Sequence, residues 1–315
     1  MPREDQLRQL HVVVGIIADD DNRILIQQRS DGPFAGLWEY PGGKVETGES
    51  VGDALARELK EELGLGVQRT TPLITITHRY PDRVITLDTH SIDAHDGQVS
   101  GAEGQPIRWV DRAQLFDEPL LPADQPLTMA INLPHTYWSL DTTGGVATSI
   151  RQLESVLSRA RLKTPHQPMI SLNMTSDADA GGVRSVAQWC ASHQIRLLLA
   201  GGPQVATWVD DLNAAGVQCP ISTLSGARER PVTKNMLLGV SVRNAAELAI
   251  FDDVGADFGV FDPGPLRQHD VDSWTEFADV ARGASVPLYA NIKHGDVGLA
   301  RQAGGQGVMR RISPD

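Results

Sequence analysis

Along the N-terminal part of the chain, apolar and polar positions alternate in short runs that are typical of β-strands. The runs HVVVGIIA at 11–18 and RILIQQR at 23–29 are separated by the turn-forming stretch DDDN, and this pattern predicts a β-hairpin. Three further runs, at 72–80, 83–94 and 107–110, have the same strand-like character. The pattern therefore predicts a mixed sheet.

One segment of this part has a helical period instead. Apolar residues recur every fourth position across 51–63, which places them on one face of a helix. Ser50 is a candidate N-cap and Gly64 a candidate C-cap. The preceding stretch at 37–49 contains Pro41 and adjacent glycines, and it is expected to be a loop.

From about residue 134, apolar runs of strand length alternate with helix-length segments. The expected strands are 136–140, 168–174, 195–200, 217–222, 237–242, 257–261, 287–292 and 307–312. The expected helices are 147–161, 181–193, 203–214, 244–253, 272–283 and 296–303. This alternation predicts an α/β protein whose C-terminal part is a TIM-type (β/α)8 barrel compressed into about 180 residues. Prolines interrupt the stretch before it, so we expect two domains, 1–132 and 133–315.

The net charge and the composition of the chain narrow the range of possible partners. The net charge is -12 and no Lys/Arg cluster exceeds a dipeptide, which argues against stable binding to duplex nucleic acid or to an anionic membrane. A small anionic substrate stays compatible if a metal ion bridges it to the protein. Cys190 and Cys219 are the only cysteines, and the N-terminal apolar run is too short for a signal peptide or a membrane span. We expect a soluble, cytoplasmic protein, and the sequence specifies no oligomeric state.

The expected helix at 51–63 is unusually acidic. Glu58, Glu61 and Glu62 lie within five residues, and like charges at helical spacing repel one another by a few tenths of a kcal/mol per pair. An exposed acidic face is one interpretation. A cluster of carboxylates that binds a divalent cation is the other, because the three side chains lie within about 100° of arc and Mg²⁺ prefers oxygen ligands.

The pattern around this helix favours the second interpretation. Residues 43–65 match G-x5-E-x7-R-E-U-x-E-E-x-G-U in full, where U is an apolar residue. This stretch resembles the Nudix box, which implies an N-terminal Nudix fold and a hydrolase of phosphoanhydride bonds that uses Mg²⁺, with Mn²⁺ as a substitute. The residues at the fixed positions are Gly43, Glu49, Arg57, Glu58, Glu61, Glu62 and Gly64.

The resemblance also assigns roles within the box. It implies that Glu58, Glu61 and Glu62 hold the metal together with the backbone carbonyl of Gly42. A glycine there permits a close approach of the backbone. Arg57 is expected to point away from this cluster and to pair with the preceding glutamate of the box, Glu49.

Beyond the box, the stretches LWEYPGGKVETGE, YPDRVITL, EGQP and LPADQP are similar in order and spacing to the MutT branch of the family, which hydrolyses oxidised dGTP. This resemblance implies that Arg29 and Glu39 line the nucleotide pocket and that Tyr80 lies against the base. It also implies that Glu103 supplies a further carboxylate to the metal or to water. Read alone, Tyr80 could equally be a core aromatic residue and Glu103 an ordinary loop acid.

Asp124 departs from the MutT pattern, which has an asparagine at this position to read the oxidised base. A carboxylate accepts hydrogen bonds but donates one only when it is protonated. Asp124 therefore fits an oxidised guanine if burial raises its pKa. The alternative is a helix N-cap before the stretch QPLTMAI.

The C-terminal part resembles thiamine phosphate synthase and its relative TenI, with the active positions eroded. Asn173 stands where that family has a basic motif, the stretch 197–202 contains no acid, and the stretches 262–270 and 291–295 replace its phosphate-binding loops. The leading hypothesis is hydrolysis of 8-oxo-dGTP, a small nucleoside triphosphate, in nucleotide-pool sanitation. A thiamine-pathway diphosphate is the alternative substrate, and a ligand-sensing or partner-binding barrel is the hypothesis from a different class.

Overall fold

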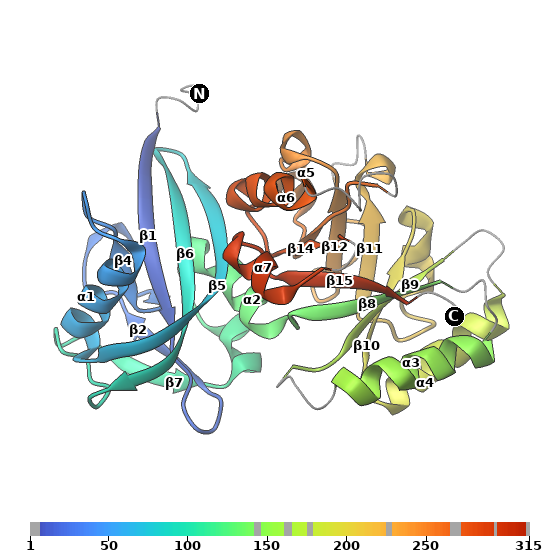
Figure 1. Ribbon diagram of the computed structural model, residues 1–315, viewed down its shortest axis with the longest axis horizontal. Coiled ribbons are helices and arrows are strands. Elements are labelled where there is room, and N and C mark those ends of the chain that lie inside the picture. The colour runs from blue at the N-terminus through green and yellow to red at the C-terminus, as the bar shows by residue number, and fades with distance from the viewer. Residues whose placement is uncertain are drawn as a thin grey trace. The chain divides into compact units, whose positions relative to one another are not determined.

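A computed structural model describes residues 7–141, 146–160, 166–174, 179–224, 229–264, 272–292 and 295–312 (Figure 1). The chain divides into two compact units. The first consists of Met1–Asn132 with Ala281–Pro287, and the second of Leu133–Val280 with Leu288–Asp315. Among the described residues, no helix has the length and apolar character needed to cross a membrane.

The first unit contains two sheets. One has the strand order β4-β1-β6-β5 and is mixed, because β1 pairs in parallel with β6 and antiparallel with β4. The other has the order β3-β2-β7 and is antiparallel. The strands are β1 Arg8–Ile16, β2 Ile24–Gln28, β3 Trp38–Glu39, β4 Gly42–Lys44, β5 Gly66–Tyr80, β6 Arg83–Asp96 and β7 Ile107–Val110. The expected mixed sheet is confirmed.

Two local predictions in this unit were wrong. The expected hairpin reduces to one bridge between Ala18 and Ile24, because β1 already has neighbours on both edges and β2 lies between β3 and β7. The expected loop at 37–49 contains the short strands β3 and β4. Two of the three residues in β4 are glycine, which disfavours a strand locally, so its pairing with β1 stabilises it.

Helix α1 (Val51–Leu63) follows the sequence pattern closely. The Ser50 side chain accepts a hydrogen bond from the Asp53 N–H, and Gly64 ends the helix in the left-handed conformation at φ 73°. Leu59 and Leu63 of the apolar face are fully buried, in a core shared with β1 and β2. Each such side chain contributes roughly 1.5–3 kcal/mol by leaving water. This burial fixes which face of α1 carries the glutamates.

A second core of the first unit packs on the other face of the sheets. It includes Tyr40, Leu115 and the buried residues of helix α2 (Gln125–Asn132). Two 3₁₀ turns lead into α2, η3 (Arg112–Asp117) and η4 (Pro122–Asp124).

The second unit is a closed barrel of eight parallel strands, as predicted. Neighbouring strands pair in the order β8 to β15, and β15 closes the barrel onto β8. Tyr137, Phe258 and Tyr289 pack edge to face. The strands are β8 Thr136–Asp141, β9 Met169–Asn173, β10 Arg196–Ala200, β11 Gly216–Pro220, β12 Leu237–Val242, β13 Phe258–Phe261, β14 Leu288–Ala290 and β15 Gly307–Ile312.

The helices of the barrel are shorter than the sequence predicts at two places. The segment 203–214 forms a 3₁₀ helix over Pro203–Trp208, whose backbone bonds span three residues, as in Val209 N–H to Ala206 O. The segment 244–253 begins with a 3₁₀ turn and is α-helical only over Ile250–Val254. The remaining elements are α3 Val146–Ala160, α4 Ala180–Ser192, η7 Ile221–Thr223, η8 Ala245–Glu247, α5 Ile250–Val254, α6 Asp272–Gly283 and α7 Val297–Gln302.

Two parts of the barrel loops named above, 265–270 and 293–294, lie outside the described residues. Of the described positions, Asn173 donates to Asp141 Oδ1 at 2.5 Å and to Ser139 Oγ at 3.0 Å. The stretch 197–202 completes β10 and then turns, with the Gly201 N–H bonded to Gln218 O.

Candidate active site

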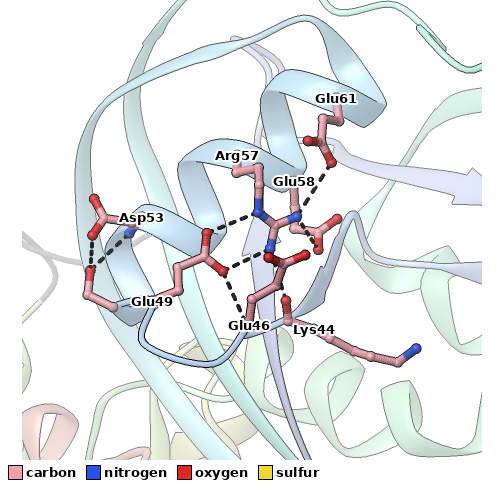
Figure 2. A network of polar contacts seen from close by, with 8 residues as sticks. Lys44, Glu46, Glu49, Asp53, Arg57, Glu58 and Glu61 are labelled. Carbon is pink, nitrogen blue, oxygen red and sulfur yellow. Dashed lines mark hydrogen bonds and ion pairs between the residues drawn. The ribbon is translucent and has the colours of Figure 1, made fainter.

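Arg57 lies at the centre of the acidic cluster on α1 (Figure 2). Its Nε and Nη2 donate to the two carboxylate oxygens of Glu49, each at 2.9 Å, which is the predicted pair. Nη1 also donates to Glu58 at 2.8 Å and to Glu61 at 3.4 Å. Arg57 therefore does not point away from the cluster, since one guanidinium serves several carboxylates whose mutual repulsion it relieves.

These contacts also tie α1 to the preceding loop. Nη2 of Arg57 donates to the carbonyl of Lys44 at 3.0 Å, at the end of β4. The hydrogen bonds from Arg57 hold the pKa of Glu49 below its ordinary value, and those to Glu49 raise the pKa of Arg57. The Arg57–Glu49 pair is thus charged at neutral pH and holds the loop against the helix.

The Glu62 carboxylate contacts the backbone of β4. Its Oε2 accepts a hydrogen bond from the Gly42 N–H at 2.8 Å. Burial raises the pKa of Glu62 to about 8, opposed by the hydrogen bonds from Gly42 and from the Gln27 side chain. The charges of Glu39 and Glu58 raise this pKa further.

The glycines of β4 make this approach possible. Gly42 has φ 143°, and a Cβ atom there would lie 2.1 Å from the carbonyl oxygen of Val13. A Cβ atom on Gly43 would lie 2.3 Å from the Glu58 carboxylate. Gly42 is therefore required for the strand pairing, whereas a side chain at Gly43 would displace the Glu58 carboxylate.

The donor set suits a hard divalent cation. Glu58, Glu61 and Glu62 supply only oxygen ligands, the kind that Mg²⁺ prefers. Within the described residues, no three His, Cys, Asp or Glu side chains lie close enough together to hold a metal ion in this arrangement. The reason is that Arg57 engages two of these glutamates and the Gly42 N–H engages the third. A cation bound by all three carboxylates would compete with Arg57 for Glu58 and Glu61 and with the Gly42 N–H for Glu62.

A cavity of about 1120 Å³ brings most of the predicted residues together. Four predicted residues are not part of its lining: Glu49, Arg57, Glu61 and Glu103. Glu61 belongs to the cluster but is 54% exposed. The predicted residues that line the cavity are Arg29, Glu39, Gly42, Glu58, Glu62, Tyr80 and Asp124.

Arg29 and Glu39 form an ion pair at one wall of this cavity. Nη1 of Arg29 donates to Glu39 Oε2 at 2.9 Å. Burial raises the pKa of Glu39, while the positive charge of Arg29 opposes that shift. The pair places one cation and one acid beside the space available to a ligand.

Asp124 is 4% exposed and borders the same cavity. Its Oδ2 accepts a hydrogen bond from the Tyr40 N–H at 3.2 Å. Burial raises the pKa of Asp124 to about 8, and the negative charge of Glu39 adds to the shift. Asp124 stands directly before α2, at the position of an N-cap residue, but it belongs to η4 and its carboxyl accepts from the Tyr40 N–H.

Tyr80 fits the interpretation as a core aromatic residue, and it is also exposed to the cavity. It packs against the second core of the unit and also lines the cavity. The ring of Phe34, which the sequence did not single out, lies 5.6 Å from the Tyr80 ring, and the Arg83 guanidinium lies 4.9 Å above Tyr80. Phe34 is the last residue of the short 3₁₀ helix η2 (Gly32–Phe34), which is too short to give a periodic signal.

The side chain of Glu103 is exposed, while its backbone is anchored. The Glu103 N–H donates to Gln105 Oε1 at 3.1 Å. Gln105 Nε2 donates in turn to Gln27 Oε1 and to the Glu62 carbonyl. The sequence analysis assigned no role to either glutamine, although Gln105 belongs to the stretch EGQP, because an uncharged amide does not by itself indicate a metal site.

The N-terminal part of the chain is similar to known proteins. A family model described as NUDIX domain matches residues 9–131. The 8-oxo-dGTP diphosphatase of Escherichia coli K12 is 36% identical over 122 residues, which is 38% of this chain and 95% of the relative. The CTP pyrophosphohydrolase of the same organism is 35% identical over 124 residues, covering 39% and 92%. A solved MutT structure from work on Aliivibrio salmonicida and Vibrio cholerae is 35% identical, covers 39% of this chain and 94% of its own, and has a TM-score of 0.34.

Helix α1 is capped and presents glutamates beside the cavity, opposite the glycine-rich strand β4. Together with the comparisons, this defines a hydrolase that acts on phosphoanhydride bonds. The chain belongs to the Nudix family, through residues 9–131.

Proposed function

We propose that the N-terminal unit hydrolyses 8-oxo-dGTP to 8-oxo-dGMP and pyrophosphate in a Mg²⁺-dependent reaction. The observation that carries the choice of substrate is Asp124, a buried carboxyl at the cavity whose pKa of about 8 keeps it largely protonated at neutral pH. A cytoplasmic role in clearing oxidised nucleotides before DNA replication follows from this substrate.

The glutamates of α1 are proposed to hold the metal. Glu58, Glu61 and Glu62 would bind it with the carbonyl of Gly42, and Glu103 would assist from its loop. Bound Mg²⁺ would neutralise the polyphosphate and lower the pKa of a water molecule. Mn²⁺ offers similar oxygen coordination and is the expected substitute.

Residues that line the cavity are proposed to recognise the base. A protonated Asp124 carboxyl has one oxygen that donates and one that accepts, which matches O6 and the N7–H of 8-oxoguanine. The Arg29–Glu39 pair contributes a second donor and acceptor at the wall. The Tyr80 ring, backed by Phe34, offers an aromatic surface for the base.

One comparison supports a second class of substrate, another nucleoside triphosphate. The relative described as a CTP pyrophosphohydrolase is nearly as similar as the 8-oxo-dGTP diphosphatase, so a different nucleoside triphosphate is the alternative. A thiamine-pathway diphosphate rests on the resemblance of the barrel alone. For the barrel itself, proposed to span 133–315, we favour a ligand-sensing or partner-binding module.

Turnover by the full chain separates these candidates. 8-oxo-dGTP, dGTP, CTP and thiamine diphosphate are each incubated with the protein and Mg²⁺, and the release of pyrophosphate or phosphate is followed. We expect the highest kcat/KM on 8-oxo-dGTP and none without a divalent cation. A higher kcat/KM on CTP or on thiamine diphosphate would replace the proposed substrate.

A further inference from the structure

Gln105 connects the loop that carries Glu103 to the end of α1. Its Nε2 donates to the backbone carbonyl of Glu62 at 2.8 Å and to Gln27 Oε1 at 3.1 Å. Its Oε1 accepts from the Glu103 N–H at 3.1 Å. One side chain therefore uses both ends of its amide to hold a loop against a helix.

Gln27 extends this connection to the Glu62 carboxylate. It is the fourth residue of β2 and is 2% exposed. While its Oε1 accepts from Gln105, its amide nitrogen is left to donate to the Glu62 carboxylate, with which it is hydrogen-bonded. Burying an amide costs free energy that an apolar side chain at the same place would avoid, so stability alone gives no reason for glutamine here.

The backbone of this loop also forms hydrogen bonds with the C-terminal end of α1. The Ala102 N–H donates to the Glu62 carbonyl at 2.8 Å, and the Ser100 N–H donates to the Leu63 carbonyl at 3.2 Å. At Gly101, a Cβ atom would lie 2.1 Å from the backbone oxygen of Gln105. The loop is thus shaped to place Gln105 within reach of Glu62.

We infer that Gln27 and Gln105 are positioning residues, which orient the Glu62 carboxylate and the Glu103 loop as one unit toward the metal. This inference rests on the proposed function, in which Glu62 and Glu103 act at the metal. Neither glutamine needs to touch the nucleotide, since both act through hydrogen bonds to the two acids. Loss of the link should weaken metal binding and turnover and leave nucleotide binding largely intact.

The experiment uses the full chain with Gln27→Leu, Gln105→Leu and the double variant. Gln114→Leu, at an exposed position of η3 in the same unit, is the matched control. Mn²⁺ binding is measured by electron paramagnetic resonance without nucleotide, and kcat and KM are measured with Mg²⁺. Each single variant should lose about tenfold in Mn²⁺ affinity and in kcat. KM should change by less than about twofold.

The double variant tests whether the two glutamines form one link. If they do, its loss should be close to that of a single variant, because the first substitution already breaks the connection. Wild-type Mn²⁺ affinity in both single variants, or a double loss equal to the product of the single losses, would overturn the inference. So would a lower unfolding temperature with unchanged Mn²⁺ binding, which indicates packing alone. A wild-type chain that binds Mn²⁺ but cleaves no nucleotide would refute the proposed function while the Mn²⁺ comparison still decides this inference.

Discussion

In the N-terminal unit three glutamates share the guanidinium of Arg57, whereas in the barrel two acids at the carboxyl ends of strands each face an asparagine. Asn173 donates to Asp141 at 2.5 Å, and Asn291 donates to Asp262 at 2.9 Å. The first arrangement has excess negative charge that a divalent cation can neutralise. The second gives each carboxylate a hydrogen bond from the end of a neighbouring strand, and Asp262 also pairs with Arg311 Nη2 at 3.5 Å.

The two regions also differ in what surrounds their acids. Glu62 and Asp124 line one cavity, and burial raises the pKa of each to about 8. Carboxyl groups with shifted pKa values in a cavity are candidates for function, since burial without full compensation costs stability. The presence of an acidic side chain therefore says little about function. Incomplete compensation of its charge by neighbouring groups says more.

The largest expected effect comes from removing charge at the glutamate cluster. Glu61→Gln and Glu62→Gln keep the side-chain volume but each removes one anionic ligand from the proposed metal site. We expect kcat with Mg²⁺ to fall by about a hundredfold or more in each variant, with the fold unchanged. Steady-state kinetics and circular dichroism measure the two properties.

The barrel provides the matched control for this experiment. Asp141→Asn makes the same chemical change at an acid that is paired with Asn173. We expect turnover within about twofold of wild type. Equal losses in Asp141→Asn and Glu62→Gln would show that the contrast between the two regions has no bearing on catalysis.

Asp124→Asn should raise selectivity by about tenfold above pH 8, where the native carboxyl has lost its donor, since one good hydrogen bond to a buried base is worth on the order of 1–3 kcal/mol. With the native carboxyl, kcat/KM for 8-oxo-dGTP relative to dGTP should fall as pH rises through about 8, because the deprotonated form cannot donate to O6. The asparagine variant should show no such fall, since an amide donates at every pH.

Selectivity is measured at several pH values from below to above 8 in both proteins. The ratio of the two kcat/KM values cancels pH effects that are common to both nucleotides. Superimposable profiles for wild type and Asp124→Asn would exclude Asp124 from base recognition.

Adding millimolar Mg²⁺ should stabilise the folded protein, because the cation binds carboxylates that otherwise repel one another. At about a hundred times its Kd a ligand contributes about 2.7 kcal/mol, which corresponds to a few degrees in the unfolding temperature. Thermal unfolding with and without Mg²⁺ measures this shift, and Glu61→Gln should reduce it. An unfolding temperature that does not respond to Mg²⁺ would contradict a metal site in this region.

Only a small effect on turnover is expected from removing the barrel. A variant that ends at residue 132 keeps every residue of the proposed site but loses Ala281–Pro287, which groups with the first unit. We expect kcat within about threefold of wild type and a lower unfolding temperature, since a domain with its own core folds alone. A folded but inactive variant would give the barrel a part in hydrolysis.

Local signals explain what could be predicted from the sequence. The capping serine, the apolar face and Gly64 act within a few residues of one another, so α1 was predicted with its correct ends. The eight barrel strands are apolar along most of their length, and parallel strands buried on both faces have this pattern.

The errors arose where tertiary contacts decide the structure. The strand β4 forms from Gly42–Lys44 because β1 offers an edge, which no local preference reveals. The contacts of Arg57 with Glu58 and Glu61 depend on rotamers, which spacing alone does not determine. Gln27 and Gln105 are 78 residues apart in the sequence, so their hydrogen bond leaves no short motif.

The hydrogen bond from Gly42 to Glu62 cannot be removed by changing a side chain at position 42. Its donor belongs to the main chain, so replacing the side chain at position 42 leaves the N–H in place and acts instead through the clash with Val13. A mutational scan will therefore report intolerance at Gly42 without distinguishing lost strand pairing from lost contact with Glu62. Replacing the amide of residue 42 by an ester removes this donor without adding a side chain, and it also weakens the Pro41 carbonyl as the acceptor for the Gly15 N–H. Chemical protein synthesis therefore tests the contact with Glu62 without the clash at Val13.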